Sequence, residues 1–146
     1  WAEHRADDKE PPVRNLEIIE TGGMKGHGPE RIREEVHALL GPLTPTGRVG
    51  SEYGMTELLS QAWSDGEGMF VSPPWMSVRM GGTNDPGSWV EEGRQGRIHI
   101  MDLANLASCA FLATSDIGRC HADGRFEVLG RFDHAEVRGC NLLTIE

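Results

Sequence analysis

Short apolar runs, glycines and one amphipathic stretch alternate over the first third of the chain. The segment Asn15–Glu20 (NLEIIE) has the length and composition of a strand and leads into Gly22-Gly23, where glycine permits a tight turn or a close backbone approach. Apolar residues then recur at helical spacing after Pro29, and Gly41-Pro42 marks the end of that segment. The pattern predicts a strand, a glycine turn and a helix in series.

A second unit repeats this plan with a weaker pattern. Arg48–Ser51 predicts a strand, Tyr53-Gly54 a turn and Met55–Trp63 a short helical stretch. Two strand–helix units in series are typical of an α/β layer. We therefore expect an α/β portion over residues 1–66.

The pattern changes after Asp65, because glycine and proline recur every few residues and the apolar segments shorten to strand length. Five strands are expected here: Met69–Ser72, Ser77–Met80, Arg97–Asp102, Cys109–Thr114 and Phe126–Arg131. Ala122–Arg125 (ADGR) predicts a hairpin turn, since Gly124 accepts a positive φ angle. Residues 67–146 are thus predicted to be mainly antiparallel β, either as a separate portion or as a layer of one domain.

Composition and charge restrict the function classes. The chain has 146 residues, 14 basic and 23 acidic, for a net charge of −9, and its basic residues form no cluster, which argues against nucleic acid and anionic membranes as partners. No apolar stretch is long enough for a membrane span. Three cysteines cannot all pair, so we expect a reducing, cytoplasmic setting. The four tryptophans, Trp1, Trp63, Trp75 and Trp89, are expected to fill the core over a β layer and not to serve as stacking platforms.

The segment Gly50–Glu57 places an aromatic ring, a hydroxyl and a carboxylate directly after a predicted strand. In a nucleotide site, Tyr53 offers a flat face to a base, Thr56 a hydrogen bond to a phosphate and Glu57 an oxygen ligand to Mg²⁺. The alternative interpretation is an ordinary strand end followed by a helix that Thr56 caps. The motif alone does not separate the two.

Two later motifs carry charged side chains, the carboxylate of Asp116 and the guanidinium of Arg131. Asp116 follows an apolar run, at what we expect to be a connection between strands, and its carboxylate can accept hydrogen bonds from both hydroxyls of a ribose. The alternative is an aspartate that caps a turn. Arg131, beside Phe132-Asp133, can bridge ribose and phosphate oxygens or form an exposed ion pair.

The order and spacing of these motifs resemble the adenylate-forming superfamily of acyl-CoA synthetases. The matching segments are Thr21-Gly22-Gly23, Tyr53–Glu57, Thr114–Arg119 and Gly130–Asp133. Within that superfamily, Asp102–Phe111 (DLANLASCAF) and Glu136–Cys140 (EVRGC) are most similar to the acyl-protein synthetases of bacterial bioluminescence. The resemblance covers most of the chain and implies the C-terminal half of an adenylate-forming enzyme fold.

The resemblance also implies a reaction. Enzymes of this family use ATP and Mg²⁺ to activate a fatty acid, or another carboxylic acid, as an acyl-adenylate, and they pass the acyl group to a protein cysteine. Cys140 lies about where that cysteine is expected, and an acyl-reductase subunit is the partner that such an enzyme would serve. Cys140, Thr56 and Glu57 are therefore the candidate catalytic residues, with Glu57 also the candidate metal ligand.

The family's binding roles fall on further residues. Tyr53 would stack on adenine with Gly54 beside it, and Gly22 and Gly23 would let the backbone approach the base or the acyl pocket. Asp116 would hold the ribose, with Arg131 next to it. These six form the candidate site for ATP or AMP.

The chain departs from the superfamily pattern in three places. Ser115 replaces the glycine of the usual Thr-Gly-Asp. Residues 1–21 contain no Ser/Thr/Gly-rich phosphate loop. The sequence also lacks the lysine-bearing C-terminal lid of ordinary acyl-CoA synthetases. From Trp1 and the missing phosphate loop we expect a fragment of a longer protein that is inactive alone.

Two other functions stay open. The stretch around Cys140 also aligns with a part of the wider superfamily that carries no acyl group, so an aryl- or acyl-CoA ligase of the phenylacetate type is the first alternative. The second is a non-catalytic module that binds a nucleotide or docks to a partner.

Overall fold

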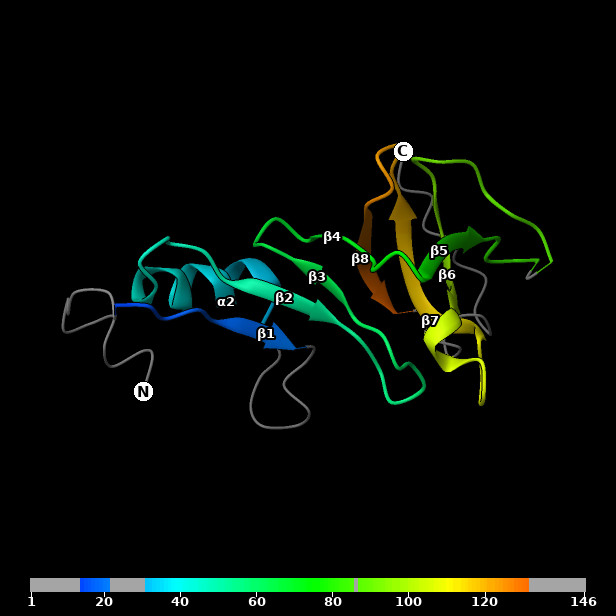
Figure 1. Ribbon diagram of the computed structural model, residues 1–146. Helices are drawn as coiled ribbons and strands as arrows, with labels where there is room; N and C mark the ends of the chain where they lie inside the picture. Colours follow the sequence, from blue (N-terminus) through cyan, green and yellow to red (C-terminus); the bar gives the residue numbers. More distant parts are fainter. Residues whose placement is uncertain (1–13, 22–30, 86, 132–146) are drawn as a thin grey trace.

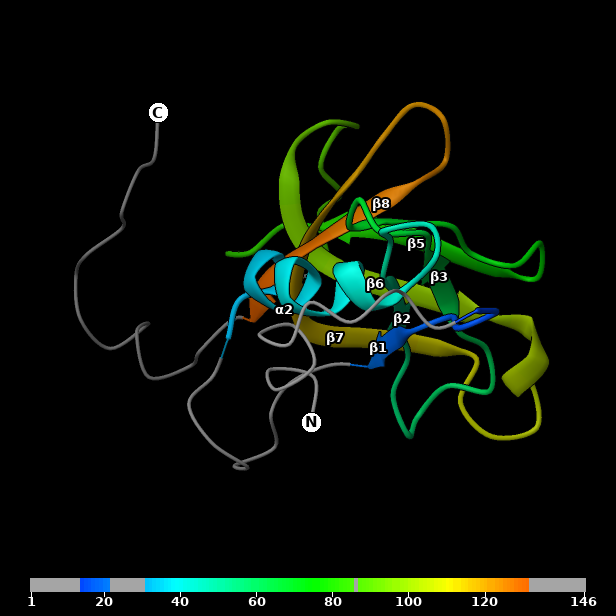
Figure 2. The same cartoon turned by 90° about the vertical axis from the view of Figure 1, so that its left-hand side faces the viewer.

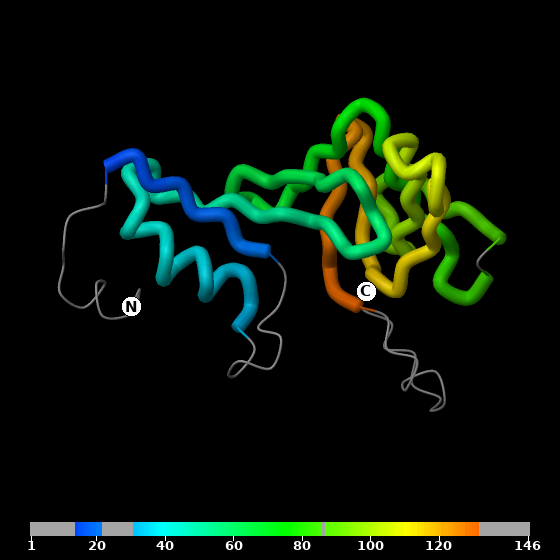
Figure 3. The backbone as a smooth tube through the Cα atoms, turned by 60° about the horizontal axis from the view of Figure 1, so that its bottom comes forward, coloured from blue at the N-terminus to red at the C-terminus, as the bar shows by residue number. Residues whose placement is uncertain are grey.

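The computed structural model describes residues 14–21, 31–85 and 87–131. In this part of the chain, two β-sheets lie end to end, with one α-helix beside the smaller sheet (Figures 1 and 3). The elements in chain order are β1 (Ile19–Thr21), α2 (Arg33–Leu40), the 3₁₀ helix η1 (Gly41–Leu43), β2 (Gly50–Tyr53), β3 (Ala62–Ser64), β4 (Met69–Phe70), β5 (Met76–Gly81), β6 (Gln95–Asp102), the 3₁₀ helix η2 (Leu103–Asn105), β7 (Phe111–Cys120) and β8 (Phe126–Arg131). No helix among the described residues is long and apolar enough to cross a membrane.

The smaller sheet has the order β1-β2-β3 and confirms the first predicted strand and helix. β1 pairs in parallel with β2, and α2 lies between them in sequence, with Glu34 and Glu35 in its first turn, where carboxylates favour the positive end of the helix dipole. The strand is shorter than the predicted Asn15–Glu20. Gly22 and Gly23, the predicted turn, lie outside the described residues.

The helix expected over Met55–Trp63 is wrong. Residues 54–61 form a loop, and the chain then enters β3, which pairs antiparallel with β2. The physical reason is a competing set of hydrogen-bond acceptors: the backbone amides of Leu59 and Ser60 donate to the Asp102 carboxylate, and Trp63 N–H donates to the Val71 carbonyl. Distant partners satisfy these amides, so a local helix gains nothing from them.

The larger sheet has the order β4-β8-β7-β6-β5 and is antiparallel throughout, which confirms the predicted β portion. In the view along the length of the molecule, α2 and β1 lie nearest to the viewer and this sheet lies behind them (Figure 2). The hairpin at Ala122–Arg125 is confirmed: His121 N–H donates to the Arg125 carbonyl at 2.8 Å, and Gly124 has a φ of +83°. One expectation fails, because Asp116 lies inside the ten-residue strand β7 and not in a connection.

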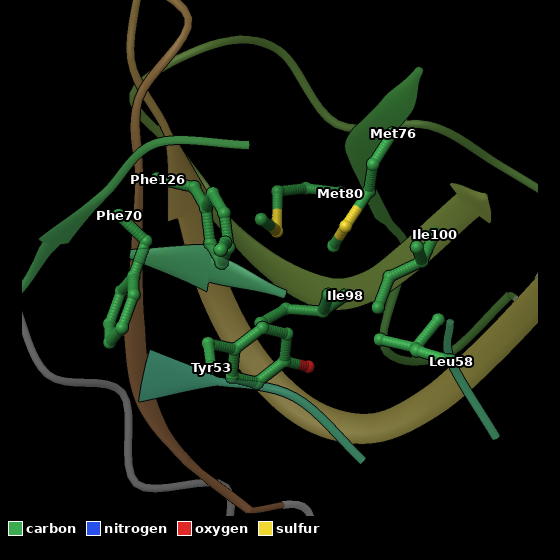
Figure 4. Close-up of a cluster of buried hydrophobic side chains, with 9 residues drawn as sticks. Tyr53, Leu58, Phe70, Met76, Met80, Ile98, Ile100 and Phe126 are labelled. Atoms are coloured by element: carbon green, nitrogen blue, oxygen red, sulfur yellow. The ribbon is translucent and has the colours of Figure 1, made fainter. Parts of the chain in front are cut away.

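The core lies on one face of the larger sheet, and β2 contributes to it. Phe70 and Phe126 stack with their ring centroids 5.5 Å apart, and the Tyr53 ring meets Phe126 edge-on at 5.5 Å (Figure 4). The buried cluster comprises Tyr53, Leu58, Ala62, Phe70, Met76, Met80, Ile98, Ile100 and Phe126. The division at residues 66 and 67 remains a prediction, but Tyr53 shows that the two sheets share this core.

The expectation that tryptophans fill the core is wrong for the three that the structure describes. Trp63, Trp75 and Trp89 are 47%, 52% and 57% exposed. Phenylalanine, isoleucine and methionine fill the space instead, because these side chains carry no N–H group that needs a partner in an apolar interior. Trp75 illustrates the constraint, since its indole N–H reaches the Ser60 hydroxyl at 3.0 Å from a half-exposed position.

Ile98 tests whether this cluster stabilises the fold. Its side chain has no exposed surface, so Ile98→Ala removes buried apolar atoms and leaves a cavity, and we expect a loss of about 3 kcal/mol in the free energy of unfolding. Leu106→Ala is the matched control, because Leu106 is 69% exposed and its truncation should cost less than about 0.5 kcal/mol. Denaturant titration of the two variants measures the difference, and equal losses would contradict this assignment of the core.

Candidate functional site

A groove with a volume of about 1190 Å³ lies where the smaller sheet meets β7 and β8. Nine residues were predicted for the site, and the six that the structure describes all line this groove: Tyr53, Gly54, Thr56, Glu57, Asp116 and Arg131. They come from the end of β2, the loop after it, the middle of β7 and the end of β8. Gly22, Gly23 and Cys140 lie outside the described residues. Motifs up to 78 residues apart in sequence are thus brought to one surface, although the role of each residue stays a prediction.

Tyr53 and Asp116 are joined by a hydrogen bond across this groove. The phenol of Tyr53 donates to Asp116 Oδ2 at 2.8 Å. Burial raises the pKa of this phenol well above its ordinary value near 10, and the Asp116 charge and the hydrogen bond add to the effect. The phenol therefore stays a neutral donor that orients the carboxylate.

The second Asp116 oxygen is less committed. Arg131 Nε lies 4.0 Å from Asp116 Oδ1, and the Arg131 side chain is 80% exposed, so this pair is loose and solvated. The Asp116 backbone N–H donates to the Thr114 hydroxyl at 3.0 Å, and that hydroxyl in turn donates to the Ile98 carbonyl on β6. One carboxylate oxygen is thus fixed and the other is available to a hydroxyl group in the groove.

The structure gives Tyr53 a position that the sequence did not reveal. Only 8% of the residue is exposed, and its ring packs against Phe70 and Phe126. The motif predicted an exposed ring that stacks on a nucleotide base. In the structure the phenol hydroxyl contacts Asp116, and most of the ring lies in the core. What Tyr53 offers to the groove is mainly the orientation of Asp116.

Thr56 and Glu57 lie on the exposed loop between β2 and β3. Asp102, which has no exposed surface, fixes this loop to β6: its Oδ2 accepts from the backbone N–H groups of Leu59 and Ser60, both at 3.0 Å. Its Oδ1 accepts from the Ser60 hydroxyl at 2.7 Å and the Ala104 N–H at 3.1 Å. Burial by itself raises the pKa of Asp102, but these hydrogen bonds outweigh it and leave the pKa below its ordinary value.

Asn105 supports the same loop from η2. Its side-chain amide donates to the Glu57 carbonyl at 2.8 Å and to the Cys109 carbonyl at 3.1 Å. Neither Asn105 nor Asp102 was predicted as a site residue. A signal was present for Asp102, because it follows Ile98 and Ile100 at a spacing of two and so falls on the buried face of the strand.

Arginine side chains enter the groove from the segment before α2 and from the helix itself. Arg31 and Arg33 both line the groove, and the Arg33 guanidinium lies 5.3 Å above the Phe70 ring and 3.4 Å from Glu20 Oε1. Arginine is suited to phosphate oxygens because its planar fork donates two parallel hydrogen bonds. Sequence reasoning missed both residues, since nothing in the helical pattern distinguishes them from surface charges.

Metal binding has a limited basis in the described part of the chain. It contains no group of three or more histidine, cysteine, aspartate or glutamate residues that could hold an ion. Mg²⁺ is commonly held by one or two carboxylates together with substrate phosphates and water, so a single carboxylate such as Glu57 fits that cation better than a structural metal.

Comparison with known proteins identifies the fold. No protein-family model matches the chain, and no curated protein matches it significantly in sequence. Among solved structures, MatB from Rhodopseudomonas palustris matches with a TM-score of 0.56 and 19% identity over 79% of this chain and 25% of MatB, and the ATP-bound form of MatB gives the same values. IdnL1 matches with a TM-score of 0.55 and 20% identity over 80% of this chain and 28% of its own.

A luciferase-like enzyme from the nonluminescent mealworm Zophobas morio also matches, with a TM-score of 0.52 and 20% identity over 77% of this chain and 31% of that enzyme. The chain therefore spans about a quarter to a third of the length of these neighbours. It has a mixed α/β architecture that corresponds to the C-terminal part of the adenylate-forming enzyme fold, which confirms the fold predicted from the motifs.

The buried phenol generates a pH prediction, because Tyr53 is the only tyrosine of the chain and reports alone. In the folded protein its ultraviolet phenolate signal should stay absent well above pH 10, whereas in guanidinium it should appear near pH 10. The folded state holds this proton more tightly than the unfolded state, so the free energy of unfolding should fall as the pH rises past about 10. A phenolate step near pH 10 in the folded protein would contradict the burial of the Tyr53 phenol beside Asp116.

Proposed function

We propose that this chain is the C-terminal part of the catalytic domain of an ATP-dependent acyl-protein synthetase, which activates a fatty acid as an acyl-adenylate and transfers the acyl group to Cys140. The observation that carries the proposal is that six residues, predicted from separate sequence motifs, line one groove. The fold supports it, because the neighbours include an enzyme whose structure contains ATP.

The groove offers matching groups to the parts of a nucleotide. The free Asp116 oxygen would accept hydrogen bonds from the ribose hydroxyls, with Arg131 close enough to contribute a second contact. Tyr53 and Gly54 would border the base. Thr56 and Glu57 would face the phosphates, where Mg²⁺ bound by Glu57 would offset the negative charge that develops during transfer.

The chemistry then proceeds in two substitutions. A carboxylate oxygen of the fatty acid attacks the α-phosphorus of ATP and pyrophosphate leaves, which gives the acyl-adenylate. The Cys140 thiolate attacks the acyl carbonyl carbon and AMP leaves, which gives a thioester on the protein. Arg138, two residues before Cys140, would favour the ionised thiol, and an acyl-reductase subunit would be the acceptor of the product.

Arginine side chains in the groove suit the first substitution. Arg33 is oriented by Glu20 and the Phe70 ring, so it presents a fixed positive charge at the groove wall. Fixed charges aimed at developing negative charge lower the barrier without reorganisation during the reaction. The Ser/Thr/Gly-rich phosphate loop of the superfamily would have to come from another segment of the protein.

A labelling experiment on the full-length protein tests the proposal. We expect incubation with ATP, Mg²⁺ and a radiolabelled long-chain fatty acid to place hydroxylamine-labile label on the wild type and to release pyrophosphate. Cys140→Ser should lose the label and keep pyrophosphate release, since the thiol acts only in the second step. Cys109→Ser is the matched control: Cys109 is exposed, and its variant should be labelled like the wild type.

The other outcomes separate the alternatives. Pyrophosphate release without label on any variant would instead indicate an acyl- or aryl-CoA ligase, in which coenzyme A receives the acyl group. Neither pyrophosphate nor label would indicate a non-catalytic module that binds a nucleotide or docks to a partner. Label that persists in Cys140→Ser and disappears in Cys109→Ser would move the acceptor to Cys109.

A further inference from the structure

The loop of residues 54–61, which carries Thr56 and Glu57, has almost no internal structure of its own. In the described part of the chain, one backbone hydrogen bond lies wholly within it, from Leu58 N–H to the Met55 carbonyl at 3.1 Å. A loop with so few internal bonds adopts a single position only when its surroundings fix it. The origin of that constraint is therefore a question about the residues packed beneath the loop.

Two buried side chains from one short segment supply the constraint. Asp102, at the end of β6, accepts two backbone N–H groups of the loop, and Asn105, in η2, donates to the Glu57 carbonyl. Asp102 has no exposed surface and Asn105 is 5% exposed, so water has little access to the two anchoring side chains. The Leu58 side chain, 6% exposed, packs into the core between the two anchored points.

These anchors hold Glu57 and its neighbours through the main chain. The Glu57 carbonyl and the Leu59 and Ser60 amides are engaged, whereas the side chains of Thr56 and Glu57 lie on exposed residues at the groove. The loop can therefore be fixed without occupying the groups that would meet a ligand.

The same strand also connects to the other side of the groove. Asp102 ends β6, and the Ile98 carbonyl on that strand accepts the Thr114 hydroxyl that holds the Asp116 backbone. β6 thus contacts both sides of the groove: its last residue, Asp102, holds the loop that carries Glu57, and Ile98, in the middle of the strand, holds Thr114 next to Asp116. A change at Asp102 should move Glu57 and leave Asp116 in place.

We infer that Asp102 and Asn105 are positioning residues that set the distance of Glu57 from the phosphate side of the groove and thereby control the affinity for Mg²⁺. The inference rests on the proposed function, because it assigns to Glu57 the metal that this function requires. The inference predicts an effect on one side of the groove only, because the proposed ribose contact at Asp116 does not depend on Asp102 or Asn105.

Two readouts on the full-length protein test the inference, with Asp102→Asn and Asn105→Leu as variants. The first is hydrogen exchange at the backbone amides of residues 54–61, which should become at least about tenfold faster. The second is pyrophosphate release as a function of Mg²⁺, where the half-saturating Mg²⁺ concentration should rise by about tenfold or more. The dissociation constant for AMP, measured by calorimetry without Mg²⁺, should change less than about twofold.

Thr44→Val is the matched control for lost stability. Thr44 is buried, and its hydroxyl bonds to the Gly41 and Arg48 carbonyls away from the loop. This variant loses buried hydrogen bonds as the others do, yet its loop exchange and Mg²⁺ requirement should match those of the wild type. An equal rise in Mg²⁺ requirement for Thr44→Val would reduce the effect to general destabilisation and overturn the inference.

The remaining outcomes separate this inference from the proposed function. Faster loop exchange with an unchanged Mg²⁺ requirement, or unchanged exchange in both variants, overturns the positioning role while the proposed function stands. Absence of pyrophosphate release from the wild type overturns the proposed function and the Mg²⁺ role together, and the exchange rates then report only whether the two side chains fix the loop.

Discussion

Asp102 is a carboxylate with no exposed surface, and four donors from three different residues converge on it. An unpaired charge in that position would be expensive to bury, so the donors and the carboxylate require one another. Their arrangement fixes the loop of residues 54–61, which connects β2 to β3. The smaller sheet therefore keeps its place beside the larger one partly through a single buried ionic group.

The groove follows from that placement. β2 ends with Tyr53 in the core of the larger sheet, where the phenol reaches Asp116 in the middle of β7. A polar contact inside an apolar surrounding has few alternative partners, and this makes it specific as well as stable. Arg31 and Arg33 bring positive charge to the groove of a protein whose net charge is −9. Together with Arg131 they offset most of the charge of the four carboxylates in the same lining, Glu20, Glu52, Glu57 and Asp116, so the described groove is close to neutral.

Much of this architecture was predictable because local patterns and tertiary contacts agree. Ile98 and Ile100 alternate with His99, and the strand they predict is the one observed; the ADGR turn likewise needs nothing beyond its own residues. The segment after Tyr53 could not be predicted, because the acceptor for its amides lies more than 40 residues later in the chain. Burial of Tyr53 and exposure of the tryptophans were missed for a related reason: side-chain type gives the preference for an environment, but which ring occupies the core depends on the register of distant strands.

The last strand of the antiparallel sheet inserts between two earlier strands. β8 lies between β4 and β7, so β4 has no neighbour in this sheet until residues 126–131 are in place. The Tyr53–Asp116 contact likewise spans 63 residues. Contacts of such sequence separation form late, because the entropy of closing the intervening chain must be lost before they contribute. During synthesis, the ribosome therefore has to release almost the whole described chain before this groove can exist, and a nascent chain halted before Phe126 would expose the Phe70 face of β4 to the chaperones and other chains around it.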